Sequence, residues 1–359
     1  MKRYVVITMR FIGNKENLLD KIDDIFNSYN IKGQSFFDFF SGTTNVARYY
    51  KKKNYEIYSS DLLYLSYCLQ KAYIENNAPP EFEQILSRLD FPQATLLSSP
   101  LDLIVDYLNQ LPGREGFIYQ NYTPAGTATL PQPRMYFSDE NGKRIDAIRQ
   151  TIENWRTGAL ITELEYFILL ACLIETVPFY ANISGVYAAF QKKWDPRAVK
   201  RLTLRPIDII TNSHQNHAYN TDSTLLCNSV STDILYLDPP YNERQYAPNY
   251  HLLETIARYD QPIIKGVTGM RNYEGQKSSF CNAQSAINTL DYIARHAQYR
   301  YLALSYNSEG IMPEKEIIAV LSQFGKVSLE QFQYSRFKSN SRGSQSDFVQ
   351  EQLYILIRS

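Results

Sequence analysis

The amino-acid sequence predicts an α/β protein with a doubly wound mixed sheet and an inserted, mainly helical region. Three observations lead to this fold class. Residues 35–77 alternate between short apolar, strand-like runs and helix-like runs. Residues from 80 to about 215 contain long helical patterns separated by loops rich in Pro and Gly. Strand-like runs return at 233–241 and continue to the end of the sequence.

The first half of the sheet is predicted over residues 15–77. Residues 15–30 have the apolar spacing of a helix. The run SFFDFF at 35–40 indicates a short strand that leads into a small-residue turn and a helix. The run EIYSSD at 56–61 indicates a second strand ending in an acid, and the following residues 62–77 indicate a helix. This β-turn-α-β-α order is typical of a doubly wound sheet.

The second half of the sheet follows the insertion. Strands are predicted at 233–241, 299–308, 326–335 and 351–359, with helices over 282–297 and IIAVLSQFG between them. The composition changes after NNAPPEF, where the helical patterns begin. We therefore expect a split α/β domain and one inserted helical region, bounded as follows: core 1–78 and 218–359, insertion 79–217.

Composition argues against several classes of protein. No apolar run reaches eighteen residues, so no transmembrane helix is expected, and the N-terminus has no secretory signal pattern. Four scattered cysteines without CxxC spacing, and only four histidines, argue against a zinc site or a disulfide framework and fit a reducing cytoplasm. The 37 basic and 37 acidic residues give a net charge of zero, which counts against non-specific coating of nucleic acid.

The strongest chemical pattern is Asp238-Pro239-Pro240-Tyr241, which closes an apolar strand. The two prolines stiffen the turn, and α/β sheets bind ligands in the crevice at the carboxyl ends of their strands. The carboxylate of Asp238 and the carbonyl of Pro239 would accept both hydrogens of an amino group on a flat base, and Tyr241 would stack on its ring. A simple turn with a buried tyrosine is the alternative.

A second pattern places a strand, a small-residue turn and a helix in sequence. Asp38 at the strand end would pair with a cationic amino group, and Gly42 would permit close approach of a ligand to the helix N-terminus. Asp61 closes the next strand, where a ribose-hydroxyl acceptor usually sits. A plain turn and, for Asp61, a helix N-cap are the alternatives. The segment RFIGNK before the first helix is a third pattern, which a helix lead-in would also explain.

Together these segments resemble the Dam-like, D12-class (α-group) adenine-specific DNA methyltransferases. RFIGNKENLL is similar to their motif X, FDFFSGTTNVA to motif I, SSDLL to motif II, NTDSTLL to motif III and LDPPY to motif IV. The segments occur in the order of the α-group, and further similar stretches extend the resemblance over most of the chain. One departure is Thr44, which replaces the second glycine usual in motif I and would narrow the cofactor site.

The resemblance implies a Rossmann-like, S-adenosylmethionine-dependent core that methylates a flipped-out adenine without a metal ion or a covalent enzyme intermediate. Asp238, Pro239, Pro240 and Tyr241 would hold the target base. The residues implied to bind S-adenosylmethionine come from four motifs: Phe11, Gly13, Lys15, Asp38, Phe40, Ser41, Gly42, Thr43, Asp61, Leu62 and Asp222.

Contacts to double-stranded DNA are expected from basic segments, with the insertion as a candidate target-recognition domain. Residues 191–206 pack six basic residues around one acid, and residues 334–342 are basic and aromatic. A solvated basic loop is the alternative. The residues selected are Lys192, Lys193, Arg197, Lys200, Arg201, Arg336 and Lys338. Residues 265–280 are a further candidate loop over DNA.

Several alternatives stay open. A cytosine-N4 or an RNA methyltransferase would use a similar site, and Thr44 leaves room for a degenerate, binding-only protein. A nicotinamide-dependent oxidoreductase is disfavoured because GxGxxG is absent. The family implies a restriction-modification system, possible pairing with a separately encoded endonuclease, and an enzyme that we expect to work as a monomer.

Overall fold

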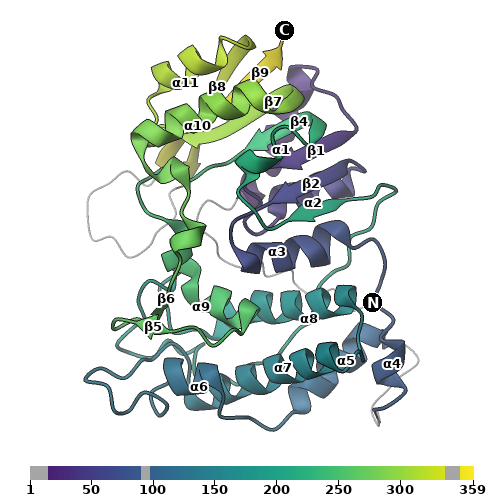
Figure 1. Cartoon of the computed structure of the whole chain (residues 1–359), viewed down its shortest axis with the longest axis vertical. Helices are drawn as coiled ribbons and strands as arrows, with labels where there is room; N and C mark the ends of the chain where they lie inside the picture. The colour runs from purple at the N-terminus through teal and green to yellow at the C-terminus, as the bar shows by residue number, and fades with distance from the viewer. Residues whose placement is uncertain (1–14, 90–97, 336–347) are drawn as a thin grey trace. The chain divides into compact units, whose positions relative to one another are not determined.

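The computed structural model describes residues 15–89, 98–335 and 348–359, which divide into two compact units (Figure 1). The sheet unit contains the described residues up to 77 together with 210–247 and 273–359. The helical unit contains residues 78–209 and 248–272. The helical unit therefore takes in a segment beyond the expected insertion of 79–217, and residues 210–217 belong to the sheet unit.

The described strands of the sheet unit form a seven-stranded sheet in the order β3-β2-β1-β4-β7-β9-β8. Strands β3, β2, β1, β4 and β7 pair in parallel, whereas β9 is antiparallel to both of its neighbours. The predicted mixed α/β sheet is confirmed. The strands are β1 (Ser35–Asp38), β2 (Glu56–Ser60), β3 (His217–Tyr219), β4 (Ser231–Leu237), β7 (Gln298–Asn307), β8 (Gly325–Ser335) and β9 (Phe348–Arg358).

Helices cover both faces of this sheet because successive strand residues point to opposite sides. The helices are η1 (Glu16–Leu18), α1 (Leu19–Ser28), α2 (Asn45–Lys52), α3 (Tyr64–Gln70), η2 (Lys71–Glu75), η4 (Ser223–Leu226), η5 (Glu274–Gln276), η6 (Ser279–Cys281), α10 (Ala283–His296) and α11 (Glu314–Leu321). On one face, Phe36 stacks on Tyr50 of α2, with ring centroids 4.1 Å apart. On the other, Phe37 joins the apolar cluster of Leu290 and Ile317, from α10 and α11.

The topology brings two kinds of strand end to one edge of the sheet. The parallel strands β1 and β4 end side by side, with Asp38 opposite Tyr236. Strand β9 runs the other way, so its first residues reach the edge where β7 ends, and Asn307 pairs with Glu351. Side chains from the start of β9 therefore share an edge with those that follow β1 and β4.

A buried arginine, Arg149, links three helices of the helical unit. Its elements, with α9 beginning in the sheet unit, are α4 (Glu83–Leu86), α5 (Pro100–Gln110), α6 (Phe117–Tyr122), α7 (Asp139–Thr157), α8 (Glu163–Thr176), η3 (Val177–Tyr180), α9 (Tyr246–Arg258), β5 (Ile264–Lys265) and β6 (Met270–Arg271). Arg149 of α7 donates to the carbonyl of Ile256 in α9 at 3.1 Å and to the hydroxyl of Tyr166 in α8 at 2.9 Å. These bonds attach α9 to the insertion and explain why residues 248–272 group with it.

The segment predicted as a loop at 265–280 begins as a β5–β6 hairpin. Arg134 is buried, and its guanidinium donates to the carbonyls of Gly266 and Val267 at 3.0 and 2.9 Å. The hydroxyl of Tyr122 donates to Gly269 at 2.8 Å. The hairpin turn is thus fixed to the helical unit. None of the helices in the described part of the chain combines the length and apolar character needed to cross a bilayer.

Candidate active site

Asp38 ends β1 inside the protein. It is 2% exposed, and its carboxylate accepts a hydrogen bond from the backbone N–H of Ala47 in α2 at 3.2 Å. The turn that follows is joined to both neighbouring strands, since Phe39 N–H donates to Tyr236 and Ser41 N–H donates to Ser60, each at 3.0 Å. The β1–α2 turn is therefore held rigidly at the carboxyl edge of the sheet.

Two residues of this turn have left-handed backbone conformations. Gly42 has φ of 48°, which glycine adopts without strain. Thr44 has φ of 65° and is fully buried at the start of α2, although a β-branched residue is a rare occupant of this region. Its hydroxyl donates to the carbonyl of Thr43 at 2.6 Å. Thr44 thus keeps the backbone shape that a glycine at this motif I position would adopt freely.

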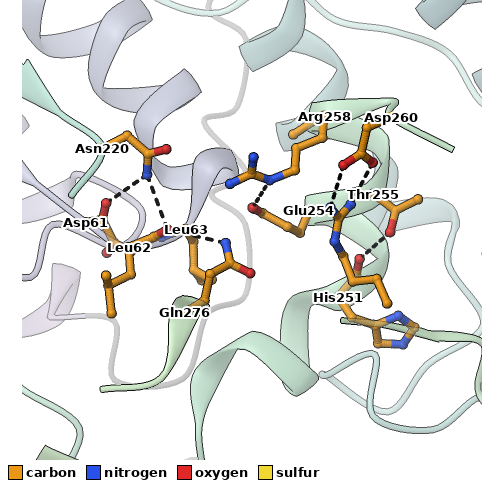
Figure 2. Close-up of polar contacts among 12 residues, drawn as sticks. Asp61, Leu62, Leu63, Asn220, His251, Glu254, Thr255, Arg258, Asp260 and Gln276 are labelled. Atoms are coloured by element: carbon orange, nitrogen blue, oxygen red, sulfur yellow. Dashed lines mark hydrogen bonds and ion pairs between the residues drawn. The ribbon is translucent and has the colours of Figure 1, made fainter. Parts of the chain in front are cut away.

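Asp61, at the end of β2, ties the turn to its neighbours. One carboxylate oxygen accepts from Gly42 N–H at 2.9 Å, and the other accepts from Leu63 N–H at 2.8 Å. Figure 2 shows that the amide of Asn220 donates to the carbonyls of Asp61 and Leu62, at 3.0 and 3.2 Å. The amide of Gln276 also donates to the carbonyl of Leu62, at 3.3 Å (Figure 2). The end of β2 is thereby fixed beside Gly42.

The segment similar to motif III contacts the segment similar to motif I through Ser223, the neighbour of Asp222. Asp222 is exposed, and its carboxylate caps η4 by accepting from Thr224 N–H at 3.0 Å. Ser223, next to it, is buried and donates to the carbonyl of Phe39 at 2.6 Å. Phe40 packs edge-on against Phe280, with ring centroids 5.3 Å apart. Asp222 thus begins a segment that is attached directly to the β1–α2 turn.

The Asp-Pro-Pro-Tyr segment follows β4. Pro239 and Pro240 are buried, Tyr241 is half-buried, and the Asp238 side chain is 19% exposed. The carbonyl of Tyr241 accepts from Ile311 N–H at 3.0 Å, which anchors the end of the segment. Asp38 is the last residue of β1, and Asp238 comes directly after β4. Because β1 and β4 are parallel neighbours, both acids lie at the same edge of the sheet.

Lys15 lies between two carboxylates. Its ammonium is 3.0 Å from the carboxylate of Glu351 in β9 and 3.5 Å from that of Asp238. The Lys15 and Glu351 side chains are only 5% and 7% exposed, so water screens this cluster poorly. The structure therefore places Lys15 against the Asp-Pro-Pro-Tyr segment, whereas the motif assigned it to the cofactor.

The carboxylates at this edge have perturbed pKa values. Burial, followed by the charge of Asp238, raises the pKa of Asp38 to about 7. Burial raises the pKa of Asp238 to about 6, with Lys15 opposing the rise and Glu351 adding to it. Burial favours the neutral form of Lys15, but Asp238 and Glu351 outweigh it and hold its pKa above the ordinary value. Clusters of such groups are typical of functional sites.

Other predicted residues lie elsewhere. Phe11, Gly13, Arg336 and Lys338 fall outside the described residues. The described basic residues of 191–206 lie in the helical unit and are exposed: Lys192, Lys193, Arg197, Lys200 and Arg201. The guanidinium of Arg197 is engaged by Asp195, at 2.6 and 3.1 Å. Within the described ranges, no group of three or more His, Cys, Asp and Glu side chains could hold a metal ion.

Glu351 is a site residue that no motif contains. In the sequence it is the first residue of the apolar run at 351–359, which predicts only a strand. A signal was present, because an acid in such a strand needs a buried partner. Finding that partner required knowing that β9 is antiparallel, which brings Glu351 to the edge occupied by Asp238.

The chain is similar to a family of DNA methyltransferases and to several of its individual members. A family model described as D12 class N6 adenine-specific DNA methyltransferase matches residues 11–320. The type II methyltransferase M.FokI of Planomicrobium okeanokoites is 42% identical over 352 residues, and modification methylase StsI of Streptococcus sanguinis is 36% identical over 354. Each match covers 97% of this chain and 52% of the relative, so the chain spans about half the length of both. The type II methyltransferase M.NlaIII of Neisseria lactamica is 37% identical over 97% of this chain and 99% of its own length.

Proposed function

Because the chain belongs to the D12 class of N6 adenine-specific DNA methyltransferases, we propose that it methylates the exocyclic amino group of a flipped-out adenine at specific DNA sites. One observation supports the proposal most directly. Asp38 and Asp238, from the segments similar to motifs I and IV, end adjacent parallel strands and interact electrostatically. One edge therefore offers an acid for a cationic ligand beside an acid for an amino group.

The β1–α2 turn fits the amino-acid part of S-adenosylmethionine, the cofactor of this family. The raised pKa of Asp38 means that its ionised form lacks full compensation, which a ligand ammonium group would supply. The buried hydroxyl of Ser41 lies close enough to Asp38 to lower the pKa of that carboxyl, yet it makes no hydrogen bond of normal geometry with a described residue, so it would reach the same ligand group. Gly42 adds no side chain to the turn. We assign Asp38, Phe40, Ser41, Gly42 and Thr43 to this end of the cofactor.

The remaining cofactor contacts are proposed from the neighbouring segments. Asp61, whose carboxylate is fixed beside Gly42 at the end of β2, would accept from a ribose hydroxyl of the cofactor. Leu62 and Asp222 would flank the adenosine. Phe11 and Gly13 keep their assignment to the methionine end. Lys15 would act between the cofactor and target sides, as its contact with Asp238 indicates.

The Asp-Pro-Pro-Tyr segment would hold the target adenine. Asp238 and the carbonyl of Pro239 would accept the two amino hydrogens, Pro240 would fix the turn, and Tyr241 would stack on the base. Accepting both hydrogens turns the lone pair of the amino nitrogen out of conjugation with the ring and towards the cofactor side. When bound, S-adenosylmethionine supplies an electrophilic methyl group. One amino hydrogen must leave as a proton once the nitrogen is alkylated, and ionised Asp238 is placed to hold it.

We assign DNA binding to the helical unit, with Lys192, Lys193, Lys200 and Arg201 contacting phosphates. Arg197 joins them only if DNA displaces its ion pair with Asp195. The β5–β6 hairpin is a further candidate contact. We further propose that the protein acts as a monomer in the cytoplasm, within a restriction-modification system whose endonuclease is encoded separately.

Separating cofactor binding from methyl transfer tests the proposal. Calorimetric titration with S-adenosylmethionine should show binding by the wild type and by Asp238→Asn, and strong weakening in Asp38→Asn. Near pH 7, binding should release protons, because a bound ammonium lowers the raised pKa of Asp38. Asp238→Asn should nevertheless transfer no methyl groups to DNA. Equal cofactor affinity in wild type and Asp38→Asn would contradict the site, and normal turnover by Asp238→Asn would contradict the target assignment.

A further inference from the structure

We propose that Glu351 of β9 is a positioning residue for methyl transfer, which holds the Lys15 ammonium away from full engagement with Asp238. The inference rests on the proposed function of Asp238. It concerns a residue in none of the motifs, placed at the site only by the antiparallel direction of β9.

The geometry favours Glu351 as the main partner of Lys15. The ammonium lies 3.0 Å from Glu351, within hydrogen-bond distance, and 3.5 Å from Asp238. Lys15 and Glu351 are nearly inaccessible to water, whereas Asp238 keeps 19% of its side chain exposed. The ammonium is thus hydrogen-bonded to the less exposed carboxylate, and the more accessible carboxylate of Asp238 is the one that a ligand would reach.

The titratable groups around Asp238 come from several elements at this edge. They are Lys15 before η1, Asp38 ending β1, Glu351 in β9, Tyr236 in β4 and Tyr241 after it. Lys15 is the cation in this set, and it faces more than one carboxylate. Without Glu351, the ammonium would bond to Asp238 alone and make that carboxylate a weaker base and a poorer acceptor for amino hydrogens.

Replacing Glu351 with Gln tests this role, because glutamine keeps the size and an acceptor oxygen but removes the charge. We expect the titration midpoint of Asp238 to fall by about one pH unit. The midpoint is followed by ¹³C NMR of protein labelled at aspartate carboxyl carbons, with Asp238→Asn identifying the signal. The acid limb of the single-turnover methylation rate should move equally, and the plateau rate should fall about threefold to tenfold.

Two comparison variants separate this role from general damage. Lys15→Met removes the cation, so it should move the Asp238 midpoint in the opposite direction, to higher pH. Glu330→Gln removes a carboxylate of β8 that accepts from the Tyr29 hydroxyl at 2.7 Å, and it should leave the midpoint unchanged. If Glu351→Gln does not fold, Glu351→Asp takes its place, because the shorter side chain draws the carboxylate away from Lys15 and should again lower the Asp238 midpoint.

An unchanged Asp238 midpoint in folded Glu351→Gln, or in Lys15→Met, would overturn the inference. The NMR midpoint does not depend on turnover, so it separates this inference from the proposed function. Expected midpoints without any methylation of DNA by the wild type would refute the proposed function and leave the charge arrangement standing. Adenine methylation with unmoved midpoints would refute the role of Glu351 and leave the proposed function standing.

Discussion

At the scale of single residues, the protonation state of Asp238 governs the proposed chemistry. An ionised carboxylate accepts amino hydrogens, whereas a protonated one would donate. Because burial raises the pKa of Asp238 to about 6, the fraction of active enzyme should fall as pH falls through that value. Single-turnover methylation measured from pH 5 to pH 8 should therefore show an acid limb near pH 6, and a rate independent of pH over this range would contradict the assignment.

Thr44 is a second residue whose backbone makes a prediction. A left-handed conformation costs a non-glycine residue about 1–2 kcal/mol. Replacing Thr44 with glycine removes this cost, but the greater flexibility of glycine in the unfolded state offsets part of the stabilisation. Thr44→Gly should therefore raise the free energy of unfolding by about 0.5–1 kcal/mol. Urea denaturation measures this change. Destabilisation by Thr44→Gly would show that the Thr44 hydroxyl bond to Thr43 outweighs the strain.

At the scale of elements, Asp61 joins the end of β2 to the segments on either side of it. Its carboxylate accepts from Gly42 N–H in the β1–α2 turn and from Leu63 N–H before α3. Asp61→Ala leaves two backbone N–H groups without these acceptors, which should lower the free energy of unfolding by about 1–3 kcal/mol. It should also weaken binding of S-adenosylmethionine. Ser59→Ala, two positions earlier in β2, is the matched control. Unchanged cofactor affinity in Asp61→Ala would remove Asp61 from the ribose role.

The elements that the sequence predicted best are those with long apolar runs. Strands β1, β4, β7 and β8 were predicted within a few residues because turn residues bound each run. Strand β3 (His217–Tyr219) was missed because it has only three half-buried residues. Helix α9 was missed as an element because Arg149, distant in sequence, holds it. Long-range partners of this kind leave no local pattern.

At the scale of the whole molecule, the two units divide the proposed work between catalysis and DNA binding. Replacing Lys192, Lys193 and Lys200 with Ala should lower DNA affinity and reduce the slope of log affinity against log salt by about 2–3. Arg197→Ala should have a smaller effect because Asp195 already pairs with it. Lys315→Ala, at an exposed site on α11, is the control. An unaltered salt slope in the triple variant would make the basic segment an ordinary solvated surface.

The site itself was predictable only in part. The order of motifs selected Asp38, Gly42, Asp61 and Asp238, and the structure joins the strand ends that carry them. The sequence could not predict the ion pairs of Lys15, because they depend on strand direction and register. The extent of the insertion was also beyond local patterns, since residues 248–272 join it through tertiary contacts.

Nucleoside mass spectrometry distinguishes adenine-N6 methylation of DNA from every alternative substrate considered above. Wild-type protein and the Asp238→Asn variant are incubated with methyl-labelled S-adenosylmethionine and mixed-sequence duplex DNA, and the digested nucleosides are analysed. We expect label in N6-methyladenine with the wild type only. Label in N4-methylcytosine, or in RNA but not in DNA supplied in parallel, would contradict the proposed substrate, and label in neither despite cofactor binding would contradict the proposed activity.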